Sequence, residues 1–137
     1  MQFEILDISG DTGIKAYGKT VSEAYANAGI GMYSLITDIS GVSERERVEF
    51  QLSGDSPEGM LAAYLNELIF RFDTQGFVGR RVEVPDLSGS SIRVIVHGEE
   101  FDADRHERRL LIKAATYHNI KVERTDHLWE VEVVFDI

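Results

Sequence analysis

The chain has 137 residues, the size of one domain, and its 43% apolar and 28% charged residues are typical of a folded globular protein. The absence of cysteine excludes disulfides, thiolate zinc sites and cysteine nucleophiles. With 14 Lys and Arg against 24 Asp and Glu, the net charge of −10 argues against sequence-independent nucleic-acid binding, which depends on neutralising phosphates. We expect a cytoplasmic protein without a membrane contact, since the chain begins without a signal-peptide pattern and has no membrane-spanning apolar run.

The first third of the chain predicts two strands and a helix. Apolar residues alternate over residues 3–8, and a second short extended segment covers residues 14–17. Thr20 with Glu23 three residues later forms a capping box, which predicts the start of a helix. Apolar positions then recur at the helical period, and we expect the helix to end near residues 37–38.

The rest of the chain predicts one more helix among several strands. After a strand over residues 48–52, Ser56 and Pro57 are the N-cap and first residue of a helix that ends at Gly76. Strands follow at 77–84 and 91–97, joined by a turn-forming link. Residues 99–109 are expected to form a loop, and 110–115 fit a strand better than a helix because no cap precedes them. Residues 120–123 and 128–135 predict a closing antiparallel hairpin.

The order of these elements predicts a single α+β domain, residues 1–137, with two principal helices and mostly antiparallel sheet. Residues 46–98 have the order strand–helix–strand–strand, and the rest of the chain repeats that order around them. We therefore expect two nested modules, an inner one at 46–98 inserted into an outer one made of 1–45 and 99–137.

Familiar catalytic motifs do not occur in the sequence. The chain has no HExxH, no GxSxG, no Walker loop and no GxGxxG, and none of its four histidines is three or four residues from another. The sequence therefore does not support a serine hydrolase, a zinc helix or a nucleotide-binding loop.

Acidic residues near both ends of the chain are candidates for a metal site. Asp11 lies between Gly10 and Gly13, where a carboxylate can approach a hard cation or can form an Asx turn. Asp136 adjoins the terminal carboxylate of Ile137, which is either a ligand or a frayed end. If the first and last strands meet in one sheet, these three carboxylates come together. Oxygen ligands without His or Cys suit Ca²⁺, Mg²⁺ or Mn²⁺ rather than Zn²⁺.

A third candidate is the charged segment from Glu99 to Arg109. Arg105 and His106 could bind an anionic group there, or the segment could be a solvated loop that has no ligand.

Several short motifs follow one another over essentially the whole chain: Asp7-Ile-Ser-Gly-Asp11-Thr-Gly, Ala24-Tyr-Ala-Asn-Ala, Gly31-Met-Tyr-Ser-Leu-Ile-Thr-Asp38, Leu65-Asn-Glu-Leu-Ile-Phe-Arg-Phe-Asp73, Gly98-Glu-Glu, Arg105-His106, Ile112-Lys-Ala-Ala-Thr-Tyr-His118 and Val134-Phe-Asp-Ile137. In this order and combination they resemble the archease family. One departure concerns the first loop, where the family usually has His-Thr-Ala-Asp and this chain has Ile8-Ser-Gly-Asp11. The aspartate is retained and the histidine is lost.

The resemblance implies a non-enzymatic accessory protein of an RtcB-type RNA ligase, which promotes guanylylation and repeated turnover of the ligase in tRNA splicing. It implies a divalent-cation site at Asp11, Asp136 and Ile137, with Ca²⁺ the ion most expected in a structure. Candidate contacts to an anion or to the partner are Asp7, Arg105, His106 and Lys113. Two alternatives remain, a metal-dependent phosphohydrolase and a small-molecule-binding module with an apolar pocket between helix and sheet.

Overall fold

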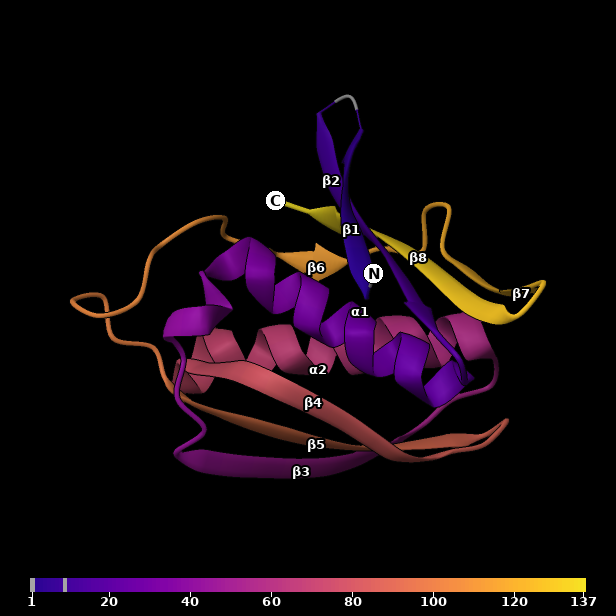
Figure 1. Ribbon diagram of the computed structural model, residues 1–137, viewed down its shortest axis with the longest axis horizontal. Helices are drawn as coiled ribbons and strands as arrows, with labels where there is room; N and C mark the ends of the chain where they lie inside the picture. The colour runs from indigo at the N-terminus through magenta and orange to yellow at the C-terminus, as the bar shows by residue number, and fades with distance from the viewer. Residues whose placement is uncertain (1, 9) are drawn as a thin grey trace.

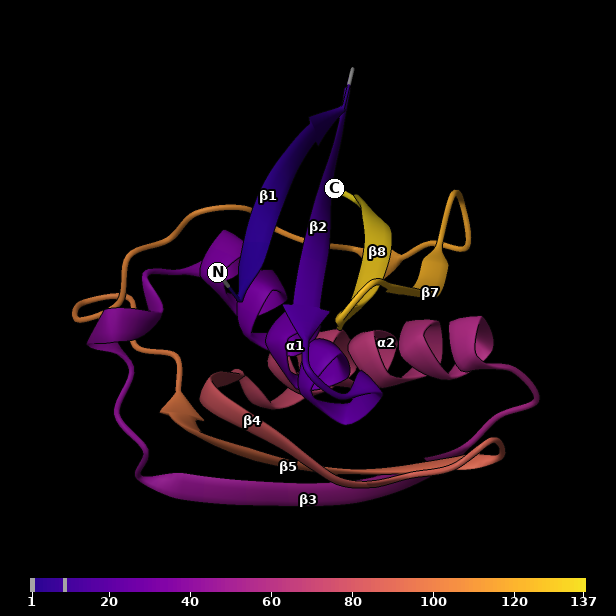
Figure 2. The same cartoon turned by 45° about the vertical axis from the view of Figure 1, so that its right-hand side comes forward.

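Two helices lie between a five-stranded and a three-stranded antiparallel sheet in the computed structural model, which describes residues 2–8 and 10–137 (Figures 1 and 2). The elements are β1 Phe3–Ile8, β2 Asp11–Gly18, α1 Val21–Ile36, a 3₁₀ turn Ile39–Gly41, β3 Glu46–Ser53, α2 Pro57–Gln75, β4 Phe77–Leu87, β5 Ser91–Glu100, β6 Ala114–Ala115, β7 Lys121–Thr125 and β8 Leu128–Asp136. This arrangement confirms the predicted α+β class with two principal helices and antiparallel sheets.

The two sheets are built from different parts of the chain. The three-stranded sheet has the order β3-β5-β4 and comes from one continuous segment that also contains α2. The five-stranded sheet has the order β1-β2-β8-β6, with β7 also paired to β8. The strand β8 therefore lies inside this sheet, with β2 along one edge and both β6 and β7 along the other. The start and the end of the chain meet there, as the candidate site requires.

Both helices begin as the sequence predicts, because their caps are local. Thr20 Oγ1 accepts a hydrogen bond from the Glu23 N–H at 3.1 Å, and Ser56 Oγ accepts one from the Gly59 N–H at 3.0 Å. Gly76 ends α2 in the left-handed conformation, with φ of 69°, and its N–H donates to the Phe72 carbonyl. The starts of both helices and the end of α2 are thus set by contacts that are local in the sequence.

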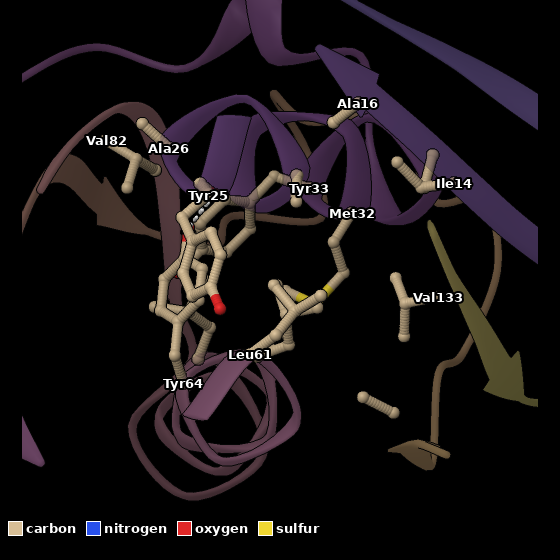
Figure 3. Packing of buried hydrophobic residues seen from close by; sticks show 14 of the residues in the cluster. Ile14, Ala16, Tyr25, Ala26, Met32, Tyr33, Leu61, Tyr64, Val82 and Val133 are labelled. Atoms are coloured by element: carbon tan, nitrogen blue, oxygen red, sulfur yellow. Dashed lines mark hydrogen bonds between the residues drawn. The ribbon is translucent and has the colours of Figure 1, made fainter. Parts of the chain in front are cut away.

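The core lies between the two sheets and contains tyrosine hydroxyls that form hydrogen bonds. Figure 3 shows Tyr25 and Tyr33 of α1 and Tyr64 of α2 directed toward one another, with Ile14 and Val133 on the side of the five-stranded sheet. The Tyr64 hydroxyl donates to the Tyr25 carbonyl at 2.8 Å, and the Tyr25 hydroxyl donates to the Pro57 carbonyl at 2.5 Å. These bonds link the two helices, and burial raises the pKa of both tyrosines far above the ordinary value.

Several strand boundaries differ from the sequence expectation. The strand β5 continues to Glu100, so Glu99 and Glu100 belong to the sheet and not to the loop that was expected from residue 99. The second strand begins at Asp11 rather than residue 14, so that Asp11 belongs to the sheet and not to a turn. Between residues 110 and 115 only Ala114–Ala115 form a strand. The strand β4 continues through Pro85 to Leu87, because the register shifts between Glu83 and Asp86 on this edge strand, where proline is tolerated.

No helix in the described part of the chain is long and apolar enough to cross a membrane.

Candidate functional site

Asp11 and Asp136 come together at one end of the five-stranded sheet. Asp11 is the first residue of β2 and Asp136 is the last residue of β8, and the two strands are antiparallel neighbours. Their register pairs Thr12 with Phe135, so its continuation by one residue places Asp11 opposite Asp136. In Figure 1 the C-terminal end of β8 lies beside the β1–β2 hairpin, which projects beyond the helices.

The two carboxylates share the outer face of the sheet. Phe135 is fully buried against the helices, so its neighbour Asp136 points the opposite way, and both aspartates are exposed. The Asp136 carbonyl accepts from the Lys113 N–H at 2.8 Å, which directs this peptide group toward β6 and away from β2. Asp11 and Asp136 are therefore a non-hydrogen-bonded pair, the type in which opposite side chains lie closer, with Cβ atoms about 4.5–5.5 Å apart.

This pair of aspartates fits a hard cation by its donor chemistry. Two carboxylates held opposite each other repel unless they share a positive ion. In residues 2–8 and 10–137, no three His, Cys, Asp or Glu side chains gather in a way that could hold a metal. The carboxylate of Ile137, which directly follows Asp136, is the third candidate ligand. An all-oxygen set of this kind suits Ca²⁺, Mg²⁺ or Mn²⁺.

Of the other candidate residues, Lys113 lies beside this site and Asp7 does not share its face. Ala114 pairs with Asp136, so Lys113, which is exposed, stands next to the end of β8. Asp7 pairs with Thr12 and therefore points from the opposite face of the hairpin.

Arg105 and His106 lie in the loop between β5 and β6, where both bind the buried carboxylate of Glu99. Glu99 is only 4% exposed and accepts from the Ser43 N–H at 2.6 Å and from His106 Nε2 at 3.0 Å. The Arg105 guanidinium lies 2.6 Å from the other oxygen of Glu99. Burial alone would raise the pKa of Glu99, but these hydrogen bonds and the Arg105 charge outweigh it and lower the pKa to about 2.

Contacts on both ring nitrogens fix the orientation of His106. The Asp102 N–H donates to Nδ1 at 2.8 Å, so the proton of the ring is on Nε2, which donates to Glu99. His106 is 4% exposed. In this arrangement His106 and Arg105 hold the loop against β5. Glu99 was not among the site residues predicted from the sequence, because it stands among several exposed charges and one of its partners, Ser43, comes from a distant segment.

Two cavities of the protein bear on whether it binds a small molecule. One of about 690 Å³ adjoins Glu99 and is lined by charged side chains, among them Arg45, Glu100 and Asp102. The other, about 270 Å³ and mostly apolar, lies against Tyr25, Met60 and Trp129. The apolar cavity falls just below the range of about 300–1,000 Å³ that is usual for ligand sites, so it gives little support to the small-molecule alternative.

The outer faces of the two sheets differ in charge. On the outer face of the three-stranded sheet, three arginines form ion pairs with three carboxylates: Arg47, Arg81, Arg93, Glu49, Glu83 and Asp86. On the five-stranded sheet, the register places six carboxylates but only two lysines on the outer face: Glu4, Asp11, Glu123, Glu130, Glu132 and Asp136, with Lys15 and Lys121. Of the two outer sheet faces, the one that carries Asp11 and Asp136 is therefore the more negative.

The fold and the carboxylate pair define a small α+β protein whose candidate site is built where the two ends of the chain meet. The family model of the Archease protein family (MTH1598/TM1083) matches residues 3–137. The chain belongs to the archease family.

Relatives and solved structures agree with this assignment. The chain is 36% identical to protein archease of Aeropyrum pernix over 94% of this chain and 92% of that protein, and 33% identical to protein archease of Methanopyrus kandleri over the whole of both. The solution structure of Methanobacterium thermoautotrophicum protein 1598 superposes with a TM-score of 0.81 at 29% identity, covering 98% of each chain. A crystal structure of a Thermotoga maritima archease, described as a possible chaperone, shares the fold, with a TM-score of 0.67 at 20% identity over 98% of this chain and 96% of that one.

Proposed function

We propose that this protein is a metal-binding accessory protein that activates an RtcB-type RNA ligase in tRNA splicing, by promoting its guanylylation and repeated turnover. Membership of the archease family supports the accessory role. The observation that carries the metal role is the placement of Asp11 opposite Asp136 on adjacent strands. The ligands of the divalent cation are Asp11, Asp136 and the Ile137 carboxylate, and the activity belongs to the cytoplasm, where the ligase is expected.

The residues of this chain bind and orient the cation rather than carry out a bond-forming step. The pairing of β2 with β8 sets the spacing of the two aspartates, and the Lys113 N–H, directly before β6, donates to the Asp136 carbonyl. A bound divalent cation would neutralise phosphate charge during nucleotidyl transfer. Lys113, next to the end of β8, is positioned to contact an anionic group brought by the partner.

The charge of the outer sheet face favours a protein partner over RNA. Six carboxylates and two lysines on one face repel a phosphate backbone but complement a basic protein surface. The ligase, and not this chain, then holds the RNA.

Multiple-turnover RNA ligation by an RtcB-type ligase, measured with and without this protein, tests the proposal. We expect the protein to convert ligation from a single turnover to many, and to raise guanylylation of the ligase in the absence of RNA. The stimulation should saturate with the ligase concentration and not with the RNA concentration. Turnover of a phosphoester by the purified protein alone would instead support the phosphohydrolase alternative.

The protein should not bind RNA by itself. Non-specific affinity needs several phosphate contacts, and the arginines of the loop between β5 and β6 are largely committed to carboxylates: Arg105 contacts Glu99, and Arg109 contacts Glu107. A gel shift at moderate salt should therefore show no complex. Tight RNA binding, together with unchanged guanylylation of the ligase without RNA, would contradict the proposal and favour an RNA chaperone.

Residues added after Ile137 should weaken activation of the ligase while leaving the fold intact. Such an extension converts the terminal carboxylate into a neutral peptide carbonyl and so removes one charged ligand. The comparison is between the protein without a tag, the same protein with a short C-terminal extension, and a protein with an N-terminal extension as the control. Equal Ca²⁺ affinity of all three, measured by isothermal titration calorimetry, would remove Ile137 from the ligand set.

A further inference from the structure

The side chain of Asn66, in the middle of α2, binds strand β6 as a neighbouring strand would. Its Oδ1 accepts from the Ala115 N–H at 2.8 Å, and its Nδ2 donates to the Ala115 carbonyl at 3.2 Å. One amide side chain thus pairs with both the donor and the acceptor of a single strand residue. Asparagine is a poorer helix former than alanine by several tenths of a kcal/mol, so these two bonds offset the local cost.

The backbone N–H and C=O of Ala115 point toward α2, because successive residues of a strand direct these groups to opposite edges of the strand. The Thr116 N–H donates to the Val134 carbonyl at 3.0 Å, so Thr116 faces β8 and its neighbour Ala115 faces the other way. Ala115 is only 4% exposed. Without Asn66, both peptide groups on the free edge of β6 would lose a partner where water has little access.

The strand β6 in turn holds the end of β8. Ala114 pairs with Asp136 and Ala115 pairs with Phe135, and the Lys113 N–H donates to the Asp136 carbonyl. Figure 1 shows β6 alongside the C-terminal part of β8. With two residues, β6 is shorter than the usual strand of 3–10 residues. Its hydrogen bonds to β8 are therefore few, and its attachment to α2 contributes a larger share of what keeps it in place.

We infer that Asn66 is a positioning residue for the Asp11–Asp136 centre. It is not a ligand of the cation. It acts through Ala115 and β6, which fix the carbonyl of Asp136 and thereby the direction of the last carboxylates of the chain. The part of the inference that concerns the ion rests on the function proposed above, whereas the mechanical link from Asn66 to β8 does not.

The experiment compares Asn66→Ala with Asn27→Ala in the full chain. Asn27 is a matched control, because it also joins a helix to this sheet, donating from Nδ2 to the Tyr17 carbonyl at 2.7 Å. Tyr17 pairs with Glu130, six residues before Asp136 along β8. Both variants should lose similar stability, so each is studied under conditions where it remains folded. Asn66→Asp, which keeps the acceptor and loses the donor, should give an intermediate effect.

Two measurements report on the inference, and one of them needs no metal. Hydrogen exchange at the Lys113 and Thr116 amides should accelerate about 10-fold in Asn66→Ala but stay close to wild type in Asn27→Ala. The Ca²⁺ affinity measured by calorimetry should fall about 10-fold in Asn66→Ala and change by less than about 2-fold in Asn27→Ala.

Unchanged exchange at those two amides would overturn the inference, and so would Asn66→Ala with the Ca²⁺ affinity of wild type. If wild-type protein binds no Ca²⁺ but Asn66→Ala still exposes the two amides, the positioning of β6 by Asn66 is supported and the metal part of the proposed function fails.

Discussion

Replacement of either Asp11 or Asp136 by alanine should remove most of the ability of this protein to activate the ligase. The two carboxylates lie opposite each other on adjacent strands and are proposed to hold one ion. Removal of one therefore leaves an incomplete site, and the double variant should be little worse than either single one. Ligation under multiple-turnover conditions and Ca²⁺ titration by calorimetry measure the two consequences separately.

Glu123→Ala is the matched control for these substitutions. Glu123 is an exposed carboxylate on the same outer face of the sheet, but it pairs with Glu130 on the far part of β8. Its removal changes the net charge by the same amount as each aspartate variant. Loss of activation by Glu123→Ala to the same extent would show that overall charge matters and not a shared ion. Defects of Asp11→Ala and Asp136→Ala that multiply in the double variant would show two separate sites.

Glu99→Ala should be the most destabilising single carboxylate substitution on this protein, by about 3 kcal/mol in the free energy of unfolding. The substitution leaves the buried Nε2–H of His106 and the Ser43 N–H without their acceptor. Glu83→Ala is the control, because Glu83 also contacts a histidine and an arginine but its side chain is 46% exposed. An exposed pair of this kind contributes about 0–1 kcal/mol. Equal midpoints of the two variants in urea would contradict this role of Glu99.

The stability that Glu99 contributes should depend on pH in a defined range. Its pKa in the folded protein is lowered from 4.5 to about 2, so the unfolded chain binds the proton first as the pH falls. The contribution is therefore complete above about pH 5 and is lost progressively between the unfolded and folded pKa values. The difference in unfolding free energy between wild type and Glu99→Gln should shrink as the pH falls from 5 to about 2. A difference that stays constant over that range would show that the carboxylate charge is not what stabilises the loop.

Local sequence signals were sufficient to predict where the helices begin, but not where the strands begin and end. Thr20 and Ser56 cap their helices through residues three positions away, so the sequence itself contains the whole interaction. The extension of β2 back to Asp11 depends instead on strand pairing, with Ile8 of β1 and, from Thr12 onward, with β8 more than a hundred residues later. The two-residue strand β6 similarly exists because Asn66 and β8 hold its two edges.

The residues of the candidate site could be predicted from the sequence, but their arrangement in space could not. The acidic residues near the two ends of the chain could be noticed in the sequence, and the resemblance to the archease family connected them. The face on which each residue lies depends on strand register, which separates Asp7 from Asp11 although both stand beside the same turn. The partners of Glu99 could not be predicted, since Ser43 lies far before it in the sequence and His106 lies in the loop that follows it.

The internal position of β8 in the five-stranded sheet has a consequence during synthesis. The ribosome releases residues 46–100, with all of β3, α2, β4 and β5, well before it makes residues 128–136. A nascent chain at that stage can pair the three-stranded sheet and cover α1 with β2 and β4, but β2 has only β1 as a neighbour and α1 lacks its contacts with β8. The candidate site is then the last part of the molecule to form. A chain released early would lack Asp136 and the strand that pairs with β2, so it could not form the Asp11–Asp136 pair.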